Sequence, residues 1–171
     1  MSTISFRPFL PQDAEALAEL FAASIEVLGE EYYSPEQRAA WASAVDDLPA
    51  FGEKLAGLLT ILAEAGGDLL GFVALKDDPK FKENRIIDML YVAPDHARQG
   101  IGKALLDVAE LIARQRGAEA LVTDASEASR EFFEAFGYEM QARNTVMRGD
   151  EWLVNTTMKK KLPPAAPKAD A

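Results

Sequence analysis

The fold is decided by residues 88–106, which read Asp88-Met89-Leu90-Tyr91-Val92-Ala93-Pro94-Asp95-His96-Ala97-Arg98-Gln99-Gly100-Ile101-Gly102-Lys103-Ala104-Leu105-Leu106. The first residues are typical of a strand, and apolar residues recur at helical spacing after the two glycines. A strand that passes through a glycine turn into a helix suits an anion, because the first N–H groups of a helix lack partners and its dipole adds positive charge. Arg98 and Lys103 add side-chain charge, so this stretch predicts a phosphate-binding turn.

Two common phosphate motifs fit this turn poorly. A nucleotide-binding P-loop needs glycine at position 97 and a hydroxyl residue after Gly102-Lys103, but alanine stands at both Ala97 and Ala104. A dinucleotide fingerprint needs a third glycine where Leu105 stands and parallel strand–helix units from the start of the chain. A magnesium-dependent NTP-binding protein is therefore disfavoured.

Working outward from the turn, alternating strand patterns and helical periodicity predict one mixed α/β domain. Ser34-Pro35-Glu36-Gln37 has the form of a helix capping box. From Leu162 onward the chain is rich in proline and alanine and offers nothing for a core, so we expect one domain over 1–162 and a disordered tail over 163–171. We expect strands over 4–9, 59–65, 69–76, 85–92 and 120–123, helices over 14–28, 35–44, 49–58, 101–117 and 126–136, and a closing hairpin over 139–147 and 152–159.

Composition excludes several kinds of site. The chain has no cysteine and one histidine, His96, so a disulfide, a cysteine nucleophile, a multi-histidine metal site and any other metal centre are not expected. The net charge of −10 opposes binding to nucleic acid or to an anionic membrane and favours a cationic amine substrate. The start has no secretory signal pattern and no long apolar run follows, so we expect a cytoplasmic protein.

The turn and its surroundings resemble motif A of the GCN5-related N-acetyltransferases, the GNAT superfamily. The matching parts are a strand ending in Leu90-Tyr91-Val92, a Pro-Asp-His loop, Arg98-Gln99-Gly100-Ile101-Gly102-Lys103, and then Ala-Leu-Leu. The family has glutamine or arginine where this chain has Ala97. The order of elements from residue 4 to about 160, and the Gly-aromatic end of Ser126 to Tyr138, are also similar to the superfamily, within a bacterial subgroup of undefined substrate.

The resemblance implies a mixed, mostly antiparallel twisted sheet of about six to seven strands with about four flanking helices, in which two central strands diverge. It implies acetyl-coenzyme A as cofactor, with the pyrophosphate on the backbone of Arg98, Gln99, Gly100, Gly102 and Lys103. Leu90 and Val92 would face the acyl-pantetheine arm, and Ser126 and Phe133 would complete the cofactor site.

Direct acetyl transfer to a primary amine needs a proton acceptor and stabilisation of an oxyanion. Strand alternation makes Asp88 the one ionisable residue on the face of Ile86, Leu90 and Val92, and apolar neighbours would raise its pKa toward useful basicity. The backbone N–H of Leu90 is the oxyanion donor that the resemblance implies. Many relatives have a tyrosine acid where this chain has Phe133, and Tyr138 is the substitute that the sequence offers.

The acceptor would be a small molecule or a peptide carrying a primary amine. Tyr33 and Trp41 fall where the first helices of the superfamily cover the acceptor site, so they could form an aromatic wall opposite Asp88. A non-catalytic coenzyme-A-binding sensor or interaction module is the alternative function. The resemblance also implies that a homodimer can form.

Overall fold

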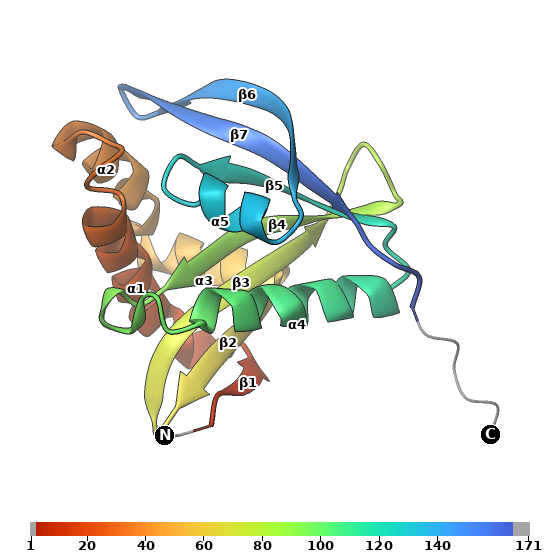
Figure 1. The fold of residues 1–171 in the computed structure, drawn as a ribbon. Coiled ribbons are helices and arrows are strands. Elements are labelled where there is room, and N and C mark those ends of the chain that lie inside the picture. Colours follow the sequence, from red (N-terminus) through yellow and green to blue (C-terminus); the bar gives the residue numbers. More distant parts are fainter. Residues whose placement is uncertain (1–2, 166–171) are drawn as a thin grey trace.

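The structure is a computed structural model that describes residues 3–165 (Figure 1). Within those residues the chain forms seven β-strands and five α-helices, joined in places by short 3-10 turns. The elements are β1 (Ser5–Pro8), α1 (Ala14–Leu28), α2 (Pro35–Ala42), α3 (Leu48–Gly57), β2 (Leu59–Ala65), β3 (Asp68–Asp77), β4 (Asn84–Val92), α4 (Ile101–Gln115), β5 (Ala120–Ser126), α5 (Arg130–Ala135), β6 (Glu139–Arg148) and β7 (Glu151–Lys161).

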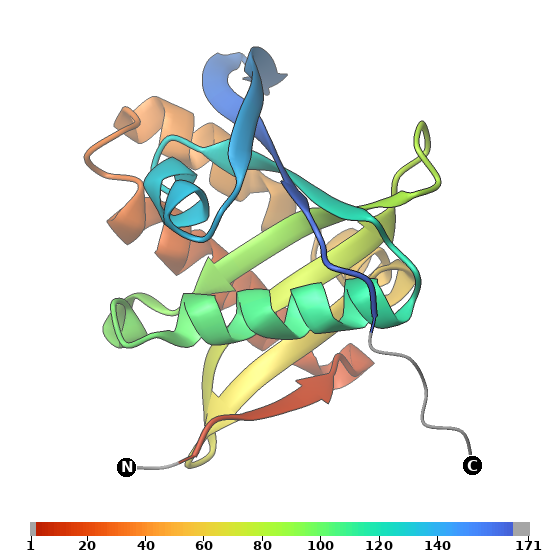
Figure 2. The same cartoon turned by 45° about the vertical axis from the view of Figure 1, so that its right-hand side comes forward.

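The strands form one twisted sheet in the order β1-β2-β3-β4-β5-β7-β6. Every neighbouring pair is antiparallel except β4 and β5, which run parallel. The expected mixed, mostly antiparallel sheet is confirmed. The five α-helices in the described part of the chain match the five expected from the sequence patterns, whereas the resemblance implied about four. They cover both faces of the sheet (Figure 2).

Two apolar cores, one on each face, hold the helices to the sheet. Helix α4 buries Ile101, Leu105, Leu106, Ala109 and Ala113, which recur at helical spacing and pack on one face together with α5. The other face is covered by α1 and α3, whose buried side chains pack against β2, β3 and β4. The sheet is thus a middle layer between two helical layers.

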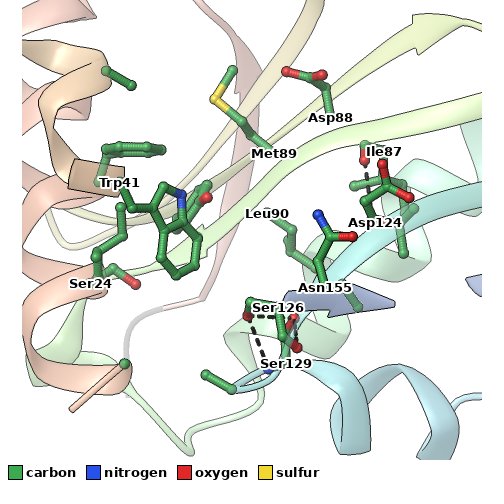
Figure 3. A pocket seen from close by; sticks show the side chains of 18 of the residues that line it. Ser24, Trp41, Ile87, Asp88, Met89, Leu90, Asp124, Ser126, Ser129 and Asn155 are labelled. Atoms are coloured by element: carbon green, nitrogen blue, oxygen red, sulfur yellow. Dashed lines mark hydrogen bonds between the residues drawn. The ribbon is translucent and has the colours of Figure 1, made fainter. Parts of the chain in front are cut away.

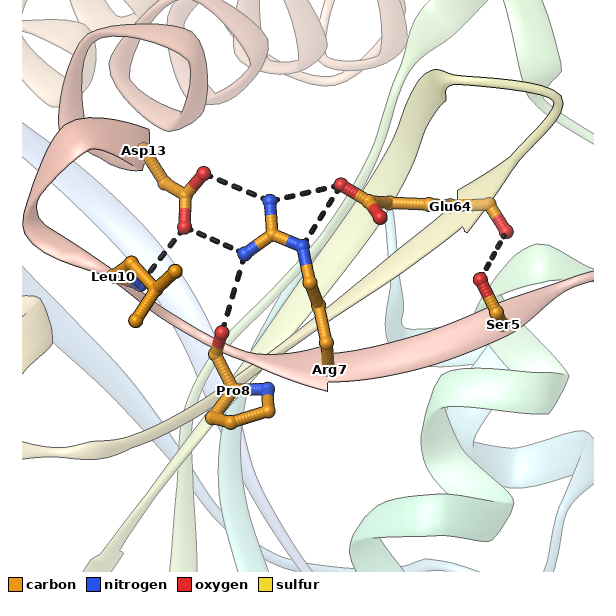
Figure 4. Close-up of polar contacts among 6 residues, drawn as sticks. All are labelled: Ser5, Arg7, Pro8, Leu10, Asp13 and Glu64. Atoms are coloured by element: carbon orange, nitrogen blue, oxygen red, sulfur yellow. Dashed lines mark hydrogen bonds and ion pairs between the residues drawn. The ribbon is translucent and has the colours of Figure 1, made fainter.

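Local signals set several element boundaries as expected. At the start of α2, Gln37 N donates to Ser34 Oγ (3.1 Å) and Ser34 N donates to Gln37 Oε1 (2.9 Å), so the predicted capping box is confirmed. At the sheet edge, Arg7 of β1 donates to both carboxylate oxygens of Asp13 (2.8 Å each) and to Glu64 of β2 (2.8 Å) (Figure 4). These contacts tie the first strand to the start of α1.

The region after β4 differs from the sequence expectation in length. Strand β5 extends to Ser126 because it stays paired with β7, where Ser126 lies opposite Asn155. Helix α5 therefore begins only at Arg130 rather than near Ser126. Leu162, which composition placed at the start of the tail, is 9% exposed, and its N–H donates to Glu119 O (2.9 Å). The prediction of a disordered tail over 163–171 concerns mostly residues 166–171, and these lie outside the described residues.

The central strands β4 and β5 separate halfway along their length. Parallel pairing joins only Asn84–Ile87 to Ala120–Thr123. Beyond that point β4 continues to Val92 beside β3, while β5 continues to Ser126 beside β7. The expected divergence of two central strands is confirmed. None of the helices in residues 3–165 is long and apolar enough to cross a membrane.

Candidate active site

A cavity of about 720 Å³ occupies the place where β4 and β5 part (Figure 3). Its walls come from both faces of the sheet: α1 and α3 on one side, α5 and the start of α4 on the other, with the β6–β7 hairpin above. Leu90 on β4 and Ser126 on β5 both line it. The cavity therefore passes through the sheet from one helical layer to the other.

The glycine turn stands at one end of this cavity. Arg98 and Gly100 have positive φ values of 61° and 84°, and the left-handed conformation at Gly100 ends the turn directly before α4. The first helical hydrogen bond is donated by Ala104 N to Gly100 O (3.0 Å), so the N–H groups of residues 101–103 precede the helical ladder. Arg98, Gln99 and Gly100 are exposed, which leaves the turn open to an anion.

Gly102 joins the turn to the cavity. It lines the cavity, and a Cβ at this position would lie 3.2 Å from Cε2 of Phe132 on α5, so a side chain here would crowd the passage. Lys103 differs from the sequence expectation: its ammonium pairs with Asp107 one turn along α4 and lies 5.2 Å from the ring of Phe136. The side-chain charge expected from Lys103 is therefore partly neutralised, and the turn depends on its backbone N–H groups and Arg98.

One hydrogen bond shows which way the backbone N–H groups of β4 point. Ala93 N donates to Leu70 O on β3 (2.8 Å), and the N–H groups of successive strand residues point to opposite edges. The N–H groups of Leu90 and Val92 consequently point away from β3, toward the edge where β5 has departed. Both residues also line the cavity. The backbone N–H groups of these two β4 residues thus face the opening.

Asp88 lies in the cavity, but in surroundings that the sequence did not predict. Ala74 of β3 pairs with Met89 and Leu75 pairs with Ile87, so Asp88 is the extra residue of a β-bulge. The bulge reverses the alternation, and the carboxylate points to the helical face of α3 rather than to the face of Leu90. There it pairs with Lys54 Nζ (3.2 Å) and Lys76 Nζ (2.9 Å).

The expectation of a raised pKa at Asp88 is therefore wrong. Burial alone would raise the pKa of this carboxyl, but the hydrogen bond from Lys76 and the charges of Lys54 and Lys76 outweigh it and hold the pKa below its usual value. Arg85, a cation on the same strand, pairs with Asp77 (3.1 Å). Asp88 is thus a largely buried carboxylate that is paired with two lysines.

The expected aromatic wall is present, although one hydroxyl in it has a structural task. The rings of Tyr33 and Trp41 meet edge to face at 5.6 Å, and Trp41 meets Tyr91 in the same way at 6.2 Å. All three line the cavity. The Tyr33 hydroxyl donates to Val154 O (2.9 Å) and accepts from Glu127 N (2.8 Å), so the ring and not the hydroxyl is offered to a ligand.

The two residues considered near α5 lie in different places. Phe133 lines the cavity, as does Ser126, whose hydroxyl lies 3.0 Å from that of Ser129. Tyr138 is not a lining residue: it is 2% exposed behind Phe133, and its hydroxyl donates to Glu110 (3.1 Å). Burial and the neighbouring Glu110 carboxylate raise its pKa well above the ordinary value. The structure therefore places the Tyr138 hydroxyl outside the cavity lining, which does not favour it as the acid.

Sequence reasoning missed a second carboxylate, Asp124, on the other side of the opening. It lines the cavity from β5, and Thr157 Oγ1 donates to its Oδ1 (2.6 Å). Asn144 Nδ2 in turn donates to Thr157 Oγ1 (2.8 Å) and to Asn155 Oδ1 (2.9 Å), so three side chains from the hairpin support the carboxylate. The predicted strand stopped at Thr123, although an acid at the carboxyl end of a strand parallel to β4 would reach the same sheet edge.

Three cationic side chains in the cavity were also missed. Lys54 and Lys76 come from α3 and β3, and Arg148 comes from the end of β6. No sequence pattern identifies these three residues as a group, because each belongs to a different element. Within its own element, each is spaced like an ordinary exposed residue. The fold alone brings them together.

Comparison with known proteins agrees with this geometry. The family model described as Acetyltransferase (GNAT) family matches residues 16–138. The uncharacterized N-acetyltransferase YafP of Escherichia coli K12 is 30% identical over 161 residues, which cover 94% of this chain and 98% of that protein.

Solved structures show the same architecture. The GCN5-related N-acetyltransferase from Rhodopseudomonas palustris, also called a class-II aminotransferase, is 47% identical with a TM-score of 0.88 over 95% of this chain and 98% of that chain. The PaiA N-acetyltransferase of Thermoplasma acidophilum, in complex with coenzyme A, is 22% identical with a TM-score of 0.77 over 93% and 99% of the two chains. The resemblance carried by residues 88–106 is confirmed, and the chain belongs to the GNAT family of acetyltransferases.

Proposed function

We propose that this protein transfers the acetyl group of acetyl-coenzyme A directly to the primary amine of a small molecule or peptide. The observation that carries the proposal is the cavity between β4 and β5, which joins the exposed glycine turn at the start of α4 to an acceptor half walled by Tyr33, Trp41 and Tyr91. The coenzyme A bound to the related PaiA fold supports the choice of cofactor.

The residues present fit coenzyme A. Backbone N–H groups from Arg98 to Lys103 would hold the pyrophosphate, because they precede the helical ladder and the helix dipole reinforces them. The outward backbone groups of Leu90 and Val92 would bind the pantetheine arm as an added strand beside β4. Ser126 and Phe133 line the β5 side of the same passage.

When bound, acetyl-coenzyme A supplies the thioester whose carbonyl carbon forms a bond to the amine nitrogen while its bond to sulfur breaks, giving an amide and coenzyme A thiol. The N–H of Leu90, which points to the opening, would donate a hydrogen bond to the thioester carbonyl oxygen and so stabilise negative charge there. An alkyl ammonium has a pKa of about 10, so the site must first accept a proton from it near neutral pH. No acyl-enzyme is needed, in keeping with a chain that has no cysteine.

We assign the proton-accepting role to Asp124, acting through water. One oxygen is held by Thr157, and the other has no hydrogen-bond or ion-pair partner within residues 3–165. Asp88, the residue that the sequence favoured, is instead engaged by two lysines that stabilise its deprotonated form and weaken it as a base. A thiol has a pKa of about 8.5, so coenzyme A can leave without help from a dedicated acid.

The first experiment is titration calorimetry with acetyl-coenzyme A. Arg98→Glu inverts the charge of an exposed residue. Because Arg98 already has a side chain at its positive φ, the change adds none of the backbone strain that replacing a glycine would cause. Arg116→Glu makes the same charge change at the far end of α4 and is the matched control. We expect wild type and Arg116→Glu to bind alike and Arg98→Glu to bind at least about tenfold more weakly, the scale of one lost charge-assisted contact.

Absence of binding to folded wild type would contradict the proposal. Binding without acetylated product across a library of primary amines would instead favour the non-catalytic coenzyme-A-binding module. Product formation, followed by release of free thiol, decides between these two functions.

A further inference from the structure

The cavity has a net charge opposite in sign to that of the whole protein. The chain carries a net charge of −10, whereas the charged side chains that line the cavity are three cations, Lys54, Lys76 and Arg148, and two carboxylates, Asp88 and Asp124. A local excess of positive charge in a strongly acidic protein is unfavourable for a ligand with several ammonium groups. It favours a ligand that brings an anion.

The first part of this cationic region is the group formed by Lys54, Asp88 and Lys76. A single carboxylate lies between the two ammonium groups, at 3.2 Å and 2.9 Å, so one positive charge is left over. The side chains of Lys54 and Lys76 are 56% and 43% exposed, whereas that of Asp88 is 15% exposed. The carboxylate is thus the inner member of the group, and the two ammonium groups are its more accessible members.

Arg148 is the second part. It comes from a different element, the end of β6, yet lines the same cavity. Within the described residues its guanidinium donates only to its neighbour's carbonyl, Met147 O (3.0 Å), so its planar fork is not occupied by a carboxylate. Arg148 and the aromatic side chains Trp41 and Tyr91 line the same cavity.

We propose that the acceptor is an amine that also carries an anionic group, a carboxylate or a phosphate, and that Arg148 binds this group together with Lys54 or Lys76. An arginine fork suits either anion because its parallel N–H donors match paired oxygens. The amine of such a ligand is attracted to Asp124 across the opening. This inference deepens the proposed function, on which it rests for the amine, and it replaces the expectation from net charge that the acceptor is purely cationic.

Ligands with one ring and chain but different charges test the proposal. 3-Phenylpropionate carries the carboxylate alone, phenethylamine carries the amine alone, and L-phenylalanine carries both, while 2-phenylethylphosphonate distinguishes a phosphate-like anion from a carboxylate. Calorimetric titration of each into the protein saturated with coenzyme A measures binding without turnover. The variants are Arg148→Gln and, as the matched control on the same strand, Arg143→Gln, whose side chain pairs with Glu127 and does not line the cavity.

We expect the anionic ligands to bind wild type and Arg143→Gln alike. Arg148→Gln should weaken them by about tenfold or more, the usual size of a lost charge-assisted contact, and should leave phenethylamine unchanged. The phosphonate or the carboxylate, whichever binds more tightly, identifies the anion.

Either of two results would overturn the proposal: phenethylamine binding as tightly as L-phenylalanine, or Arg148→Gln changing all ligands equally. Both results leave the acetyltransferase activity intact, whereas failure of the proposed function appears as missing acetyl-coenzyme A binding or missing product. The two failures are therefore distinguishable.

Discussion

Asp124→Asn is the most informative substitution for the chemistry of this site. The asparagine keeps the size of the side chain, and its Oδ1 can still accept the hydrogen bond that Thr157 Oγ1 donates at 2.6 Å. The change therefore removes the negative charge and the proton-accepting oxygen while preserving the support from the hairpin. A large effect on turnover could not then be ascribed to lost packing.

The expected magnitude follows from the two roles of the carboxylate. General base catalysis raises the rate by about 10²- to 10⁴-fold. We take the lower end because the proton travels through water. The expected loss in kcat is therefore about 10²-fold, or about 2.7 kcal/mol. The exchange of a charge-assisted hydrogen bond for a neutral one costs about 1 kcal/mol or less of folding stability. The loss in kcat thus greatly exceeds the loss in stability.

The assay is steady-state thiol release with a saturating primary amine, together with urea denaturation. Asp88→Asn is measured in parallel, and Asp77→Asn, an exposed carboxylate paired with Arg85 outside the cavity, is the control for the substitution itself. We expect Asp88→Asn to change KM for the acceptor more than kcat, because it unbalances Lys54 and Lys76. If Asp124→Asn keeps its kcat within about threefold while Asp88→Asn loses about 10²-fold, the assignment of the base is wrong and the original expectation for Asp88 holds.

Three further predictions concern the scaffold. Leu105→Ala removes a fully buried side chain from the α4 core and should lower the free energy of unfolding in urea by about 2–5 kcal/mol. A loss below about 1 kcal/mol would mean that neighbouring side chains fill the space left by the leucine. Gly71→Ala would place a Cβ 2.6 Å from Tyr91 O, so calorimetry should show weaker acetyl-coenzyme A binding as the end of β4 shifts, and unchanged binding would contradict that coupling. Arg7 holds the pKa of Asp13 below its usual value, so this pair stabilises the fold above about pH 4 and loses its effect as the pH falls through the lowered value. The stability difference between wild type and Arg7→Gln, about 1 kcal/mol or less near neutral pH, should accordingly shrink toward pH 2, and an undiminished difference there would refute the electrostatic explanation.

Local patterns in the sequence were enough to predict the glycine turn before α4 and most of the helices and strands. The glycine at position 100, the apolar spacing of α4 and the capping box at Ser34 depend on hydrogen bonds and packing between residues a few positions apart. Such interactions are written into short stretches, because the backbone requirement and the residue that meets it lie together. The order of elements along the chain followed from the same signals, and the resemblance to the family added the mixed, mostly antiparallel sheet.

Only the tertiary structure decided which side chains meet in the cavity. A single bulge residue at Asp88 turned that carboxylate from the face of Leu90 to two lysines on other elements, and pairing of β5 with β7 brought Asp124 to the opening. Arg148 reached the same cavity from the far end of the chain. Register, bulges and the contacts of long side chains are set by partners distant in sequence, so the charge of the cavity is a property of the assembled sheet and not of any one segment.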